Sequence, residues 1–473
     1  MRIKKLICVF LGIAMCFGAV GCAFGVDDDV NDGRTRLKIS YYKAGYGDEW
    51  LKQIGAAFEK VHPDVKIVYD GDYNMDTYIP LRLENAEKGG DVADICTVLT
   101  RKNFTDYINK GYLEDLTDLY DEKTADNMAL KDVILPDSLK IGRLGDSDKY
   151  YGVPWTTSVS GIVYNSKMFA ANGWSVPETV DELLALCETI KAKALKNGNT
   201  TVAPLVFSGA SIQGYFQHLL TSWFRMYEGE ESFNEFYKFE SAEIFKKQGR
   251  LEAYKAEAKL LGNNNSLLGS DNFDYLRAQR EFIMGNAAMI TAGSWIETEM
   301  SAFMKGYPDF EMKIMPMPLL GATKDENGNW LDKTGEKVQH INAGGAGDNF
   351  VIPKQAKQKE LAKEFLLFMS SQEMLTLYSK YTNSPRPYTY TNSDWSSLSA
   401  FGQSAMEVYQ KSITVSPYSD TPIYTQNNIS EYTYAHAQIM DRAGSETKAL
   451  EQAQQLFEDD YKNAVERFGA YGG

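Results

Sequence analysis

A strand, a helix and a second strand follow one another early in this chain, and this order limits the fold more than any other feature. Apolar residues alternate over residues 37–41, recur at helical spacing over residues 50–61, and alternate again over residues 65–69. His62-Pro63-Asp64 separates the helical stretch from the second alternating stretch. Because a helix between two strands is the usual connection in a parallel sheet, the sequence predicts an open α/β sheet.

A second unit of the same kind follows. Its helix is predicted over residues 78–88, Gly89-Gly90 ends that helix, and residues 94–99 form an apolar run typical of a buried strand. About 440 residues remain after the N-terminal segment, which is too many for one hydrophobic core and suits two or three domains. No repeat of 20 to 50 residues is visible, so the chain is not expected to be a solenoid.

The N-terminus has the pattern of an export signal. Arg2, Lys4 and Lys5 precede an apolar run over residues 6–20, and Gly21 and Cys22 follow it. A membrane-spanning helix needs roughly 20 apolar residues, so this run is short for a retained span. The sequence predicts a signal peptide over residues 1–21.

The residues around its end resemble a bacterial lipobox. In Ala19-Val20-Gly21-Cys22 the cysteine would become lipidated, although the lipobox usually has Leu where this chain has Ala19. Residues 22–36, acidic and without hydrophobic period, are expected to form a flexible tether. We therefore expect an exported protein anchored by Cys22 to the outer face of the cell membrane, or a periplasmic protein in a two-membrane bacterium.

Charge and cysteine content exclude several classes. The net charge is −15, from 64 acidic and 49 basic residues, which disfavours binding to nucleic acid. Three of the five cysteines lie in the export segment, leaving Cys96 and Cys187, so neither a disulfide framework nor a zinc site is predicted. Two buried free thiols are the favoured interpretation, and one bridge between them stays open.

Four segments occur in an order that resembles one protein family. They are an extended stretch over residues 149–165, the run 282–289 with Gly293-Ser294-Trp295 after it, the Gly-rich approach to residues 350–353 with 361–366 after it, and Ser384-Pro385-Arg386-Pro387. Together they resemble the bacterial extracellular solute-binding proteins of the maltose-binding-protein type, which serve ABC importers.

That resemblance implies an α/β type II periplasmic-binding-protein fold, a Venus flytrap of two discontinuous lobes joined by about three hinge crossings. It places residues 37–150 and 290–345 in lobe 1, and residues 151–289 and 346–473 in lobe 2. Lobe closure would bury a small ligand, here a sugar or oligosaccharide, and the closed monomer would meet the membrane permease. No cofactor, metal or ATP site is expected, since the chain has no Gly-x-x-x-x-Gly-Lys-Ser/Thr loop.

A sugar site needs flat apolar rings and planar polar groups, and nine residues are candidates. Trp295 is the leading one because it matches the motif position of the family, and Trp155 beside the first crossing is next. Polar candidates at the carboxyl ends of predicted strands are expected to line the cleft. The remaining candidates are Lys43, Tyr46, Asp48, Arg101, Tyr215, Asp348 and Arg386.

Each polar candidate also has a plain structural explanation. Lys43, Tyr46 and Asp48 could form a solvated turn, and Asp348 and Arg386 could pair with each other at the surface. Arg101 and Lys102 stand where maltose-type members show an acidic and a basic residue, which leaves an acidic sugar open as the ligand.

Other functions remain open at this stage. A secreted glycoside hydrolase would need two facing carboxylates, which 64 acidic residues could supply, but no Gly-x-Ser-x-Gly or His-Glu-x-x-His motif is present. The chain could instead bind a peptide, a polyamine or ferric iron. The tyrosine pairs Tyr41-Tyr42 and Tyr150-Tyr151 suit iron poorly, because neighbouring side chains of a strand point to opposite faces.

One acidic segment imitates a calcium loop. Acidic or amide residues fall at alternate positions in residues 325–330, but Trp330 occupies the sixth position, where an EF-hand loop needs glycine. Asn327-Gly328 instead predicts the tight turn of a β-hairpin.

Overall fold

The computed structural model of the chain describes residues 32–145, 147–211, 215–262, 264–333, 335–344, 348–416 and 445–471. The predicted signal peptide, Cys22 and most of the predicted tether lie outside these ranges. Within them, Cys96 and Cys187 are buried free thiols, as predicted, and burial raises the pKa of each to about 12. No helix in the described ranges has the length and apolar character needed to cross a membrane.

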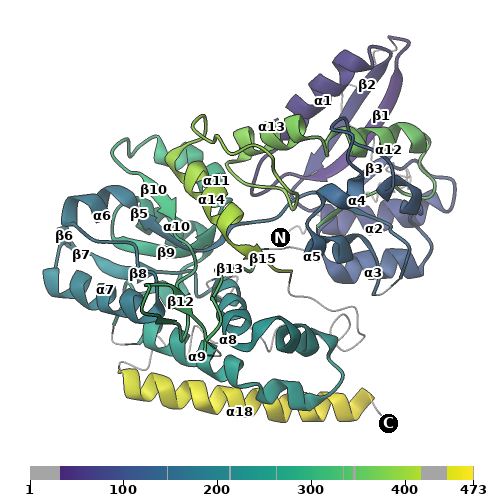
Figure 1. Cartoon of the computed structure of the whole chain (residues 1–473). Helices are drawn as coiled ribbons and strands as arrows, with labels where there is room; N and C mark the ends of the chain where they lie inside the picture. The colour runs from purple at the N-terminus through teal and green to yellow at the C-terminus, as the bar shows by residue number, and fades with distance from the viewer. Residues whose placement is uncertain are drawn as a thin grey trace, which may run out of the picture.

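Two larger sheets build the molecule, one in each lobe (Figure 1). The sheet of the first lobe has the strand order β2-β1-β3-β14-β4. β1 runs parallel to β2 and β3, whereas β14 is antiparallel to β3 and to β4. The strands are β1 (Thr35–Tyr42), β2 (Val65–Asp72), β3 (Ile95–Val98), β4 (Val153–Pro154) and β14 (Asn349–Val351).

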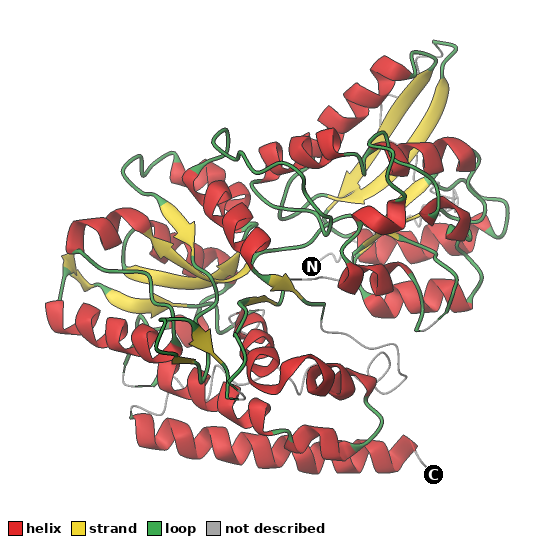
Figure 2. Cartoon of the chain, viewed as in Figure 1, coloured by secondary structure: helices red, strands yellow, loops and turns green. Residues whose placement is uncertain are grey.

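The strand–helix–strand prediction for the first lobe is confirmed. α1 connects β1 to β2, and its residues Trp50, Leu51, Ile54 and Phe58 are buried at the predicted helical spacing. Helices lie on both faces of the sheet (Figure 2). They are α1 (Glu49–Val61), α2 (Met75–Ala86), α3 (Arg101–Asn109), α12 (Lys359–Phe368) and α13 (Gln372–Thr382).

The second lobe is built on a sheet with the order β10-β5-β9-β8. Its central strand β9 is buried along its whole length, which fits a sheet covered by helices on both faces. The strands are β5 (Ser160–Asn165), β8 (Ala203–Val206), β9 (Ala287–Gly293) and β10 (Met312–Ile314). The main helices are α6 (Ser166–Asn172), α7 (Val180–Lys193), α8 (Phe216–Lys238), α9 (Gln248–Leu261), α10 (Tyr275–Ile283), α11 (Ile296–Met304), α14 (Ala400–Lys411) and α18 (Glu446–Tyr471).

These sheets correct the predicted lobe boundaries. Residues 290–345 were expected in lobe 1, but β9 pairs with β5 and β8, so this part of the chain belongs to the second lobe. Residues 346–473 were expected in lobe 2, but β14 pairs with β3 and β4 in the first lobe. The chain returns to the second lobe at α14, which packs on β10.

From β4 to α14, the described elements therefore change lobe three times. The first crossing, residues 155–159, joins β4 to β5. The second leads from β13 (Ile341–Asn342), which pairs with β15 (Ile413–Thr414), to β14. The third, residues 383–399, joins α13 to α14.

Serine and glycine residues fasten the crossings to one another. The Ser294 hydroxyl accepts a hydrogen bond from the Val159 backbone N–H at 3.2 Å and lies 2.7 Å from the Ser384 hydroxyl. The Ser158 backbone N–H donates to the Gly344 carbonyl at 3.0 Å. A Cβ atom at Gly344 would lie 1.6 Å from the Ser158 carbonyl oxygen, so only glycine fits there.

The C-terminal helix α18 completes the core of the second lobe. It lies along α9 at the lower edge of Figure 1, and its residues Ala449 and Ala453 are buried in that core. The Asp460 carboxylate accepts hydrogen bonds from Arg250 at 3.0 Å and from the Tyr254 hydroxyl at 2.6 Å. This buried, charge-assisted contact fixes α18 to α9.

Candidate functional site

Trp295 lies where the second lobe meets the first. It follows β9 directly and begins α11, and a Cβ atom at Gly293 would lie 2.2 Å from its ring. The ring packs against the hydrophobic core of the first lobe, and its Cβ is 3.9 Å from the Cβ position of Gly45 in the loop after β1. Its indole N–H is buried and faces the Tyr215 hydroxyl, where it partly offsets the rise that burial gives to the pKa of that tyrosine. Gly293 thus allows the ring to fold over the end of the strand and face both lobes.

Two residues of α8 extend this aromatic surface. The Tyr215 ring centroid lies 5.0 Å from that of Trp295, and the His218 centroid lies 6.1 Å from it. Tyr215 occupies the left-handed region, with φ of 61°, at the N-terminus of α8. We call Trp295, Tyr215 and His218 the aromatic wall.

The hydrogen bonding of His218 defines which of its ring nitrogens is available. Its Nδ1 lies 2.7 Å from the Ala343 carbonyl oxygen, which can only accept, so Nδ1 carries the proton. Burial lowers the pKa of His218 to about 4, which keeps the ring neutral near pH 7. Nε2 is therefore a hydrogen-bond acceptor within the aromatic wall.

Three carboxyl groups lie near the wall, two from the first lobe and one from the second. Asp348 precedes β14, Asp76 lies in the first turn of α2, and Glu299 lies one turn after Trp295 on α11. All three, with Tyr275 of α10, are close enough to Tyr42 at the end of β1 to raise its pKa, after the larger effect of burial. Tyr42 thus stands between groups of both lobes, which places this constellation in the interlobe cleft.

The pKa values of these carboxyl groups are raised. Burial, followed by the nearby charge of Asp76, raises the pKa of Asp348 to about 8, although part of its side chain still reaches solvent. Burial also raises the pKa values of Asp76 and Glu299, partly offset by hydrogen bonds from Asn103 and Gln279. Asp348 is therefore mostly protonated at pH 7.

The structure brings Trp295, Tyr215 and Asp348 together, and it uses the other candidates differently. Arg386 is fully buried and makes no pair with Asp348. Its guanidinium donates to the Trp155 carbonyl at 2.9 Å and to the Met369 and Pro154 carbonyls. Arg386 is therefore a structural residue of the hinge, because its donors already serve the backbone of the crossings.

Arg101 is buried as well, and it also bonds to backbone. Its guanidinium donates to the Ile141 carbonyl at 2.9 Å and to the Arg143 carbonyl. Arg101, whose charge left an acidic sugar open as the ligand, thus stabilises a loop of the first lobe.

Trp155 belongs to the core of the first lobe. It is 2% exposed, and its ring stacks on Trp50 with centroids 5.4 Å apart and planes inclined by 10°. Phe350 covers it from another side, so neither ring face is open to a ligand.

The loop after β1 is held by internal contacts. Asp48 accepts a hydrogen bond from the Tyr41 hydroxyl at 2.8 Å, and its carboxylate pairs with Lys52 at 3.1 Å and Lys43 at 3.5 Å. Tyr46 is buried, and its hydroxyl lies 3.1 Å from that of Ser294. Lys43 and Asp48 therefore form a turn stabilised by ion pairs, and Tyr46 belongs to the hinge.

Neither the ferric-iron site nor the calcium loop considered from the sequence gains support from the structure. Tyr41 bonds to Asp48, while Tyr150 stacks on Tyr120 with centroids 3.7 Å apart. No group of three His, Cys, Asp or Glu side chains that could hold a metal occurs among the described residues. The calcium-like segment forms the predicted hairpin, in which β11 (Thr323–Lys324) pairs with β12 (Trp330–Leu331).

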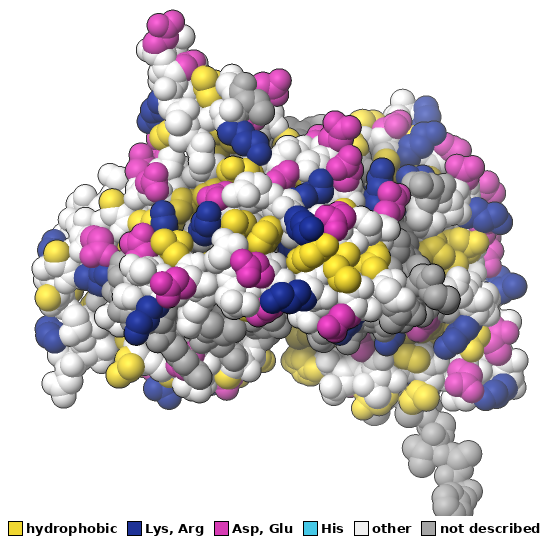
Figure 3. Space-filling view, turned by 90° about the horizontal axis from the view of Figure 1, so that it is seen from below, with side chains coloured by type: hydrophobic (Ala, Val, Ile, Leu, Met, Phe, Trp, Pro, Cys, Tyr) yellow, Lys and Arg dark blue, Asp and Glu magenta, His cyan; other side chains and the backbone are white. Residues whose placement is uncertain are grey.

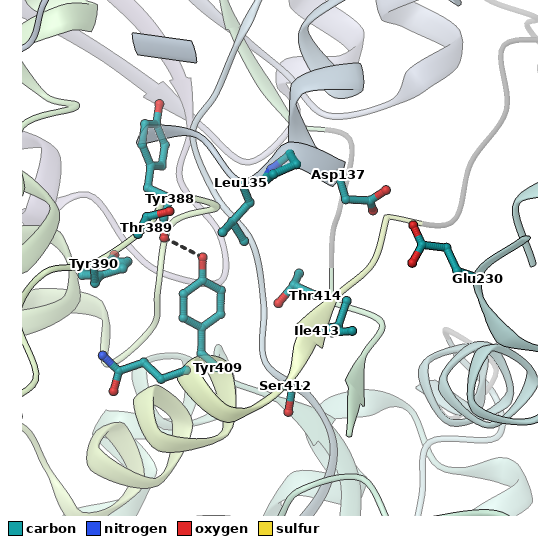
Figure 4. A pocket seen from close by; sticks show the side chains of 12 residues that line it. Leu135, Asp137, Glu230, Tyr388, Thr389, Tyr390, Tyr409, Ser412, Ile413 and Thr414 are labelled. Atoms are coloured by element: carbon teal, nitrogen blue, oxygen red, sulfur yellow. Dashed lines mark hydrogen bonds between the residues drawn. The ribbon is translucent and has the colours of Figure 1, made fainter. Parts of the chain in front are cut away.

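A cavity of about 750 Å³ lies elsewhere, between Leu135 to Asp137 of the first lobe and Glu230 of α8. Figure 4 shows the Asp137 and Glu230 carboxylates on the same side of this cavity and Tyr409 bonded to the Tyr388 carbonyl. Of its three rings, Tyr388 and Tyr409 are buried, and the half-buried Tyr390 packs edge-on against Trp395 and Tyr409. The cleft beside the aromatic wall remains the candidate site.

Sequence reasoning missed His218, Asp76, Glu299 and Tyr42. Two of them carried a usable signal. Asp76 follows a strand end in the same way as Asp48, and Glu299 is four residues after Trp295, on the same face of a helix. Nothing in the local pattern distinguished His218 from an ordinary helical histidine.

Comparisons with known proteins agree on the family and the fold. The family model described as bacterial extracellular solute-binding protein matches residues 44–375. The diacetylchitobiose binding protein NgcE of Streptomyces coelicolor is 25% identical over 356 residues, covering 74% of this chain and 69% of that protein. The multiple sugar-binding protein of Streptococcus mutans is 26% identical over 344 residues, covering 72% of each chain.

Solved structures resemble the fold over most of its length. The solute-binding protein RafE in complex with raffinose has a TM-score of 0.61 at 20% identity, covering 90% of this chain and all of that chain. A probable secreted solute-binding lipoprotein from Streptomyces coelicolor has a TM-score of 0.64 at 17% identity, covering 89% and 98%. At these identities the likeness concerns the two-lobe fold alone.

Proposed function

Because this chain belongs to the bacterial extracellular solute-binding protein family, we propose that it captures a sugar or oligosaccharide between its lobes for the permease of an ABC importer. The observation that carries this proposal is the aromatic wall beside carboxyl groups of both lobes. Aromatic rings offer flat apolar faces for the C–H face of a pyranose, and the carboxyl groups and His218 Nε2 can bond to its hydroxyl groups.

The hinge suits capture by closure. A ligand favours the closed state only as far as it contacts both lobes more in that state. Trp295 and Glu299 belong to the second lobe, whereas Asp76 and Asp348 belong to the first. A sugar that touches both pairs would therefore stabilise closure, and the closed form would be the one that the permease recognises.

We propose that the protein is a carrier and not an enzyme. Its named relatives are binding proteins, and hydrolysis would need a proton donor and a second carboxylate on either side of a scissile bond. Because Asp348 and Glu299 could serve such roles, the test is incubation of each bound sugar with stoichiometric protein, followed by product analysis. Release of shorter sugars would favour the hydrolase.

Export and anchoring through Cys22 complete the proposal. The expected result for the full chain in a bacterial host is partition into the detergent phase, with Cys22→Ser partitioning into the aqueous phase. Equal partition of the two forms would remove the lipid anchor from the proposal while leaving the binding function intact.

A thermal-shift screen tests the binding function. The chain without its export segment would be screened against monosaccharides, oligosaccharides, peptides and polyamines, since a ligand that binds only the folded state raises Tm. A shift with a carbohydrate is expected. A shift with peptides alone would overturn the sugar assignment.

A further inference from the structure

The three carboxyl groups of the cleft have no basic partner among the described residues. No Lys or Arg in the described ranges forms an ion pair with Asp76, Asp348 or Glu299, and no cation lowers the pKa of any of them. The side-chain hydrogen bonds to them come from neutral amides, with Asn103 3.3 Å from Asp76 and Gln279 2.8 Å from Glu299. The carboxyl groups of the cleft therefore lack a countercharge among the described residues.

This pattern differs from the rest of the first lobe. There, Asp70 pairs with Arg82, Asp91 pairs with Lys38 at 2.8 Å, and Glu114 pairs with Lys359 at 2.7 Å. These paired carboxylates of the first lobe contrast with the three carboxyl groups of the cleft, for which the described residues provide no such cation.

Gln279 provides a second, independent sign of a missing ligand. It is 1% exposed, its amide nitrogen donates to Glu299, and its amide oxygen is buried without a hydrogen-bond partner. An unpaired buried acceptor is costly, so a donor is expected to reach it in the loaded protein. A donor at this position would lie beside both the Gln279 amide oxygen and the Glu299 carboxylate. An ammonium group, which has three donors and a positive charge, suits this pair of acceptors.

A metal ion fits this site poorly. The described residues contain no group of three metal-ligating side chains close enough to surround one ion. The negative groups are spread over two lobes, with Asp76 and Asp348 on one side and Glu299 on the other. A larger organic cation can lie between them.

We propose that the cleft selects sugars that carry a free amino group over neutral sugars and excludes uronic acids. This inference rests on the proposed function and specifies its substrate class. An ammonium group between Glu299 and the first-lobe carboxyl groups removes the repulsion that closure would otherwise create, whereas a uronate adds to it. The aromatic wall supplies the faces that hold the sugar rings.

The test is calorimetric titration at about pH 7 with three disaccharides of similar size: fully deacetylated chitobiose, diacetylchitobiose and a uronic-acid disaccharide. The amino sugar is expected to bind about tenfold more tightly than the neutral one, with the difference shrinking as salt rises. Binding of the amino sugar should also release protons, because its charge ionises Asp348, and the measured enthalpy should therefore depend on the buffer.

Matched variants assign the effect to the cleft. Glu299→Gln and Asp76→Asn should each reduce the preference for the amino sugar, measured as the ratio of the two affinities, several-fold. Glu311→Gln, which removes one negative charge elsewhere in the second lobe, should leave the preference unchanged. The Tm of each variant shows whether it is folded.

The outcomes separate this inference from the proposed function. Equal binding of the amino and neutral sugars, or tighter binding of the uronate, overturns the charge selection and leaves sugar binding standing. Binding of a polyamine without any disaccharide overturns both, as does the absence of binding by every carbohydrate tested.

Discussion

The hinge and the cleft use polar side chains in opposite ways, although only a few residues separate them along the chain. In the hinge, Arg386 and Ser294 are buried and bond to backbone and hydroxyl groups of the crossings. In the cleft, the Gln279 amide nitrogen is bonded to Glu299, whereas its amide oxygen is buried without a partner. Because folding rarely leaves buried polar groups unpaired, the bonds of Arg386 and Ser294 mark them as structural, while Gln279 keeps an acceptor for a ligand.

Replacing Arg386 is the strongest test of the hinge. Arg386→Met leaves the Trp155, Pro154 and Met369 carbonyls without this donor, so a loss of about 3–5 kcal/mol in the free energy of unfolding is expected. Denaturant unfolding would measure it, with exposed Lys102→Met as the control. A loss below about 1 kcal/mol would contradict the hinge role.

The two tryptophans should separate binding from stability. Trp295→Ala is expected to weaken sugar binding by about 2 kcal/mol, roughly 30-fold, because it removes the centre of the aromatic wall. Calorimetry measures this, and Trp330→Ala in the hairpin is the matched control. Unchanged affinity would remove Trp295 from the site.

Trp155→Leu should show the reverse behaviour. Its ring stacks on Trp50 in the core, so the expected effect is a loss of about 2 kcal/mol in stability, with sugar affinity within about twofold of the original. Denaturant unfolding and calorimetry on the same preparation would measure both quantities. A large loss of affinity at full stability would move Trp155 back into the ligand site.

Ser294→Ala tests how firmly the crossings are joined. The change removes the acceptor of the Val159 N–H and the contact with Ser384, and about 1–2 kcal/mol of stability should be lost. Gly344 remains to hold the first and second crossings, so ligand closure should still occur in small-angle scattering. Loss of closure at preserved stability would show that Ser294 controls the motion itself.

The smallest expected effect is a pH dependence carried by Asp348. Its pKa is raised by burial to about 8 in the folded chain, above the ordinary value near 3.9, so the folded state holds the proton more tightly. The stability from this group is therefore complete below about pH 4 and is lost as the pH rises through 8. Asp348→Asn should flatten this decline in the free energy of unfolding between pH 5 and 8, and an unchanged decline would exclude Asp348 as its source.

Local sequence patterns were sufficient for the elements and insufficient for their assembly. Alternation and helical spacing predicted β1, α1 and β2, since those periods reflect burial along one element. The apolar run of β9 indicates a strand buried on both faces, but such a run fits the centre of either sheet. The lobe boundaries were therefore wrong at this strand and at β14.

Side-chain direction explains the mixed result at the site. Trp155, Trp295 and Arg386 all lie beside crossings, and sequence position alone gives them similar weight. Three-dimensional packing turns Trp155 toward Trp50 and Arg386 toward backbone carbonyls, while the missing side chain of Gly293 leaves room for Trp295 to fold over the strand end. On the face shown in Figure 3, acidic and basic side chains are interspersed. The net charge of −15 therefore did not indicate where in the molecule carboxyl groups lack a basic partner.

The position of α18 also has a consequence for the order in which the protein is made. The first lobe has all its strands once β14 has been synthesised and is closed by α13, which ends at Thr382. The second lobe needs Asp460 to engage Arg250 and Tyr254, so its core stays open until α18 has been synthesised. A truncated message that ends before α18 would therefore yield a folded first lobe joined to an unfinished second one.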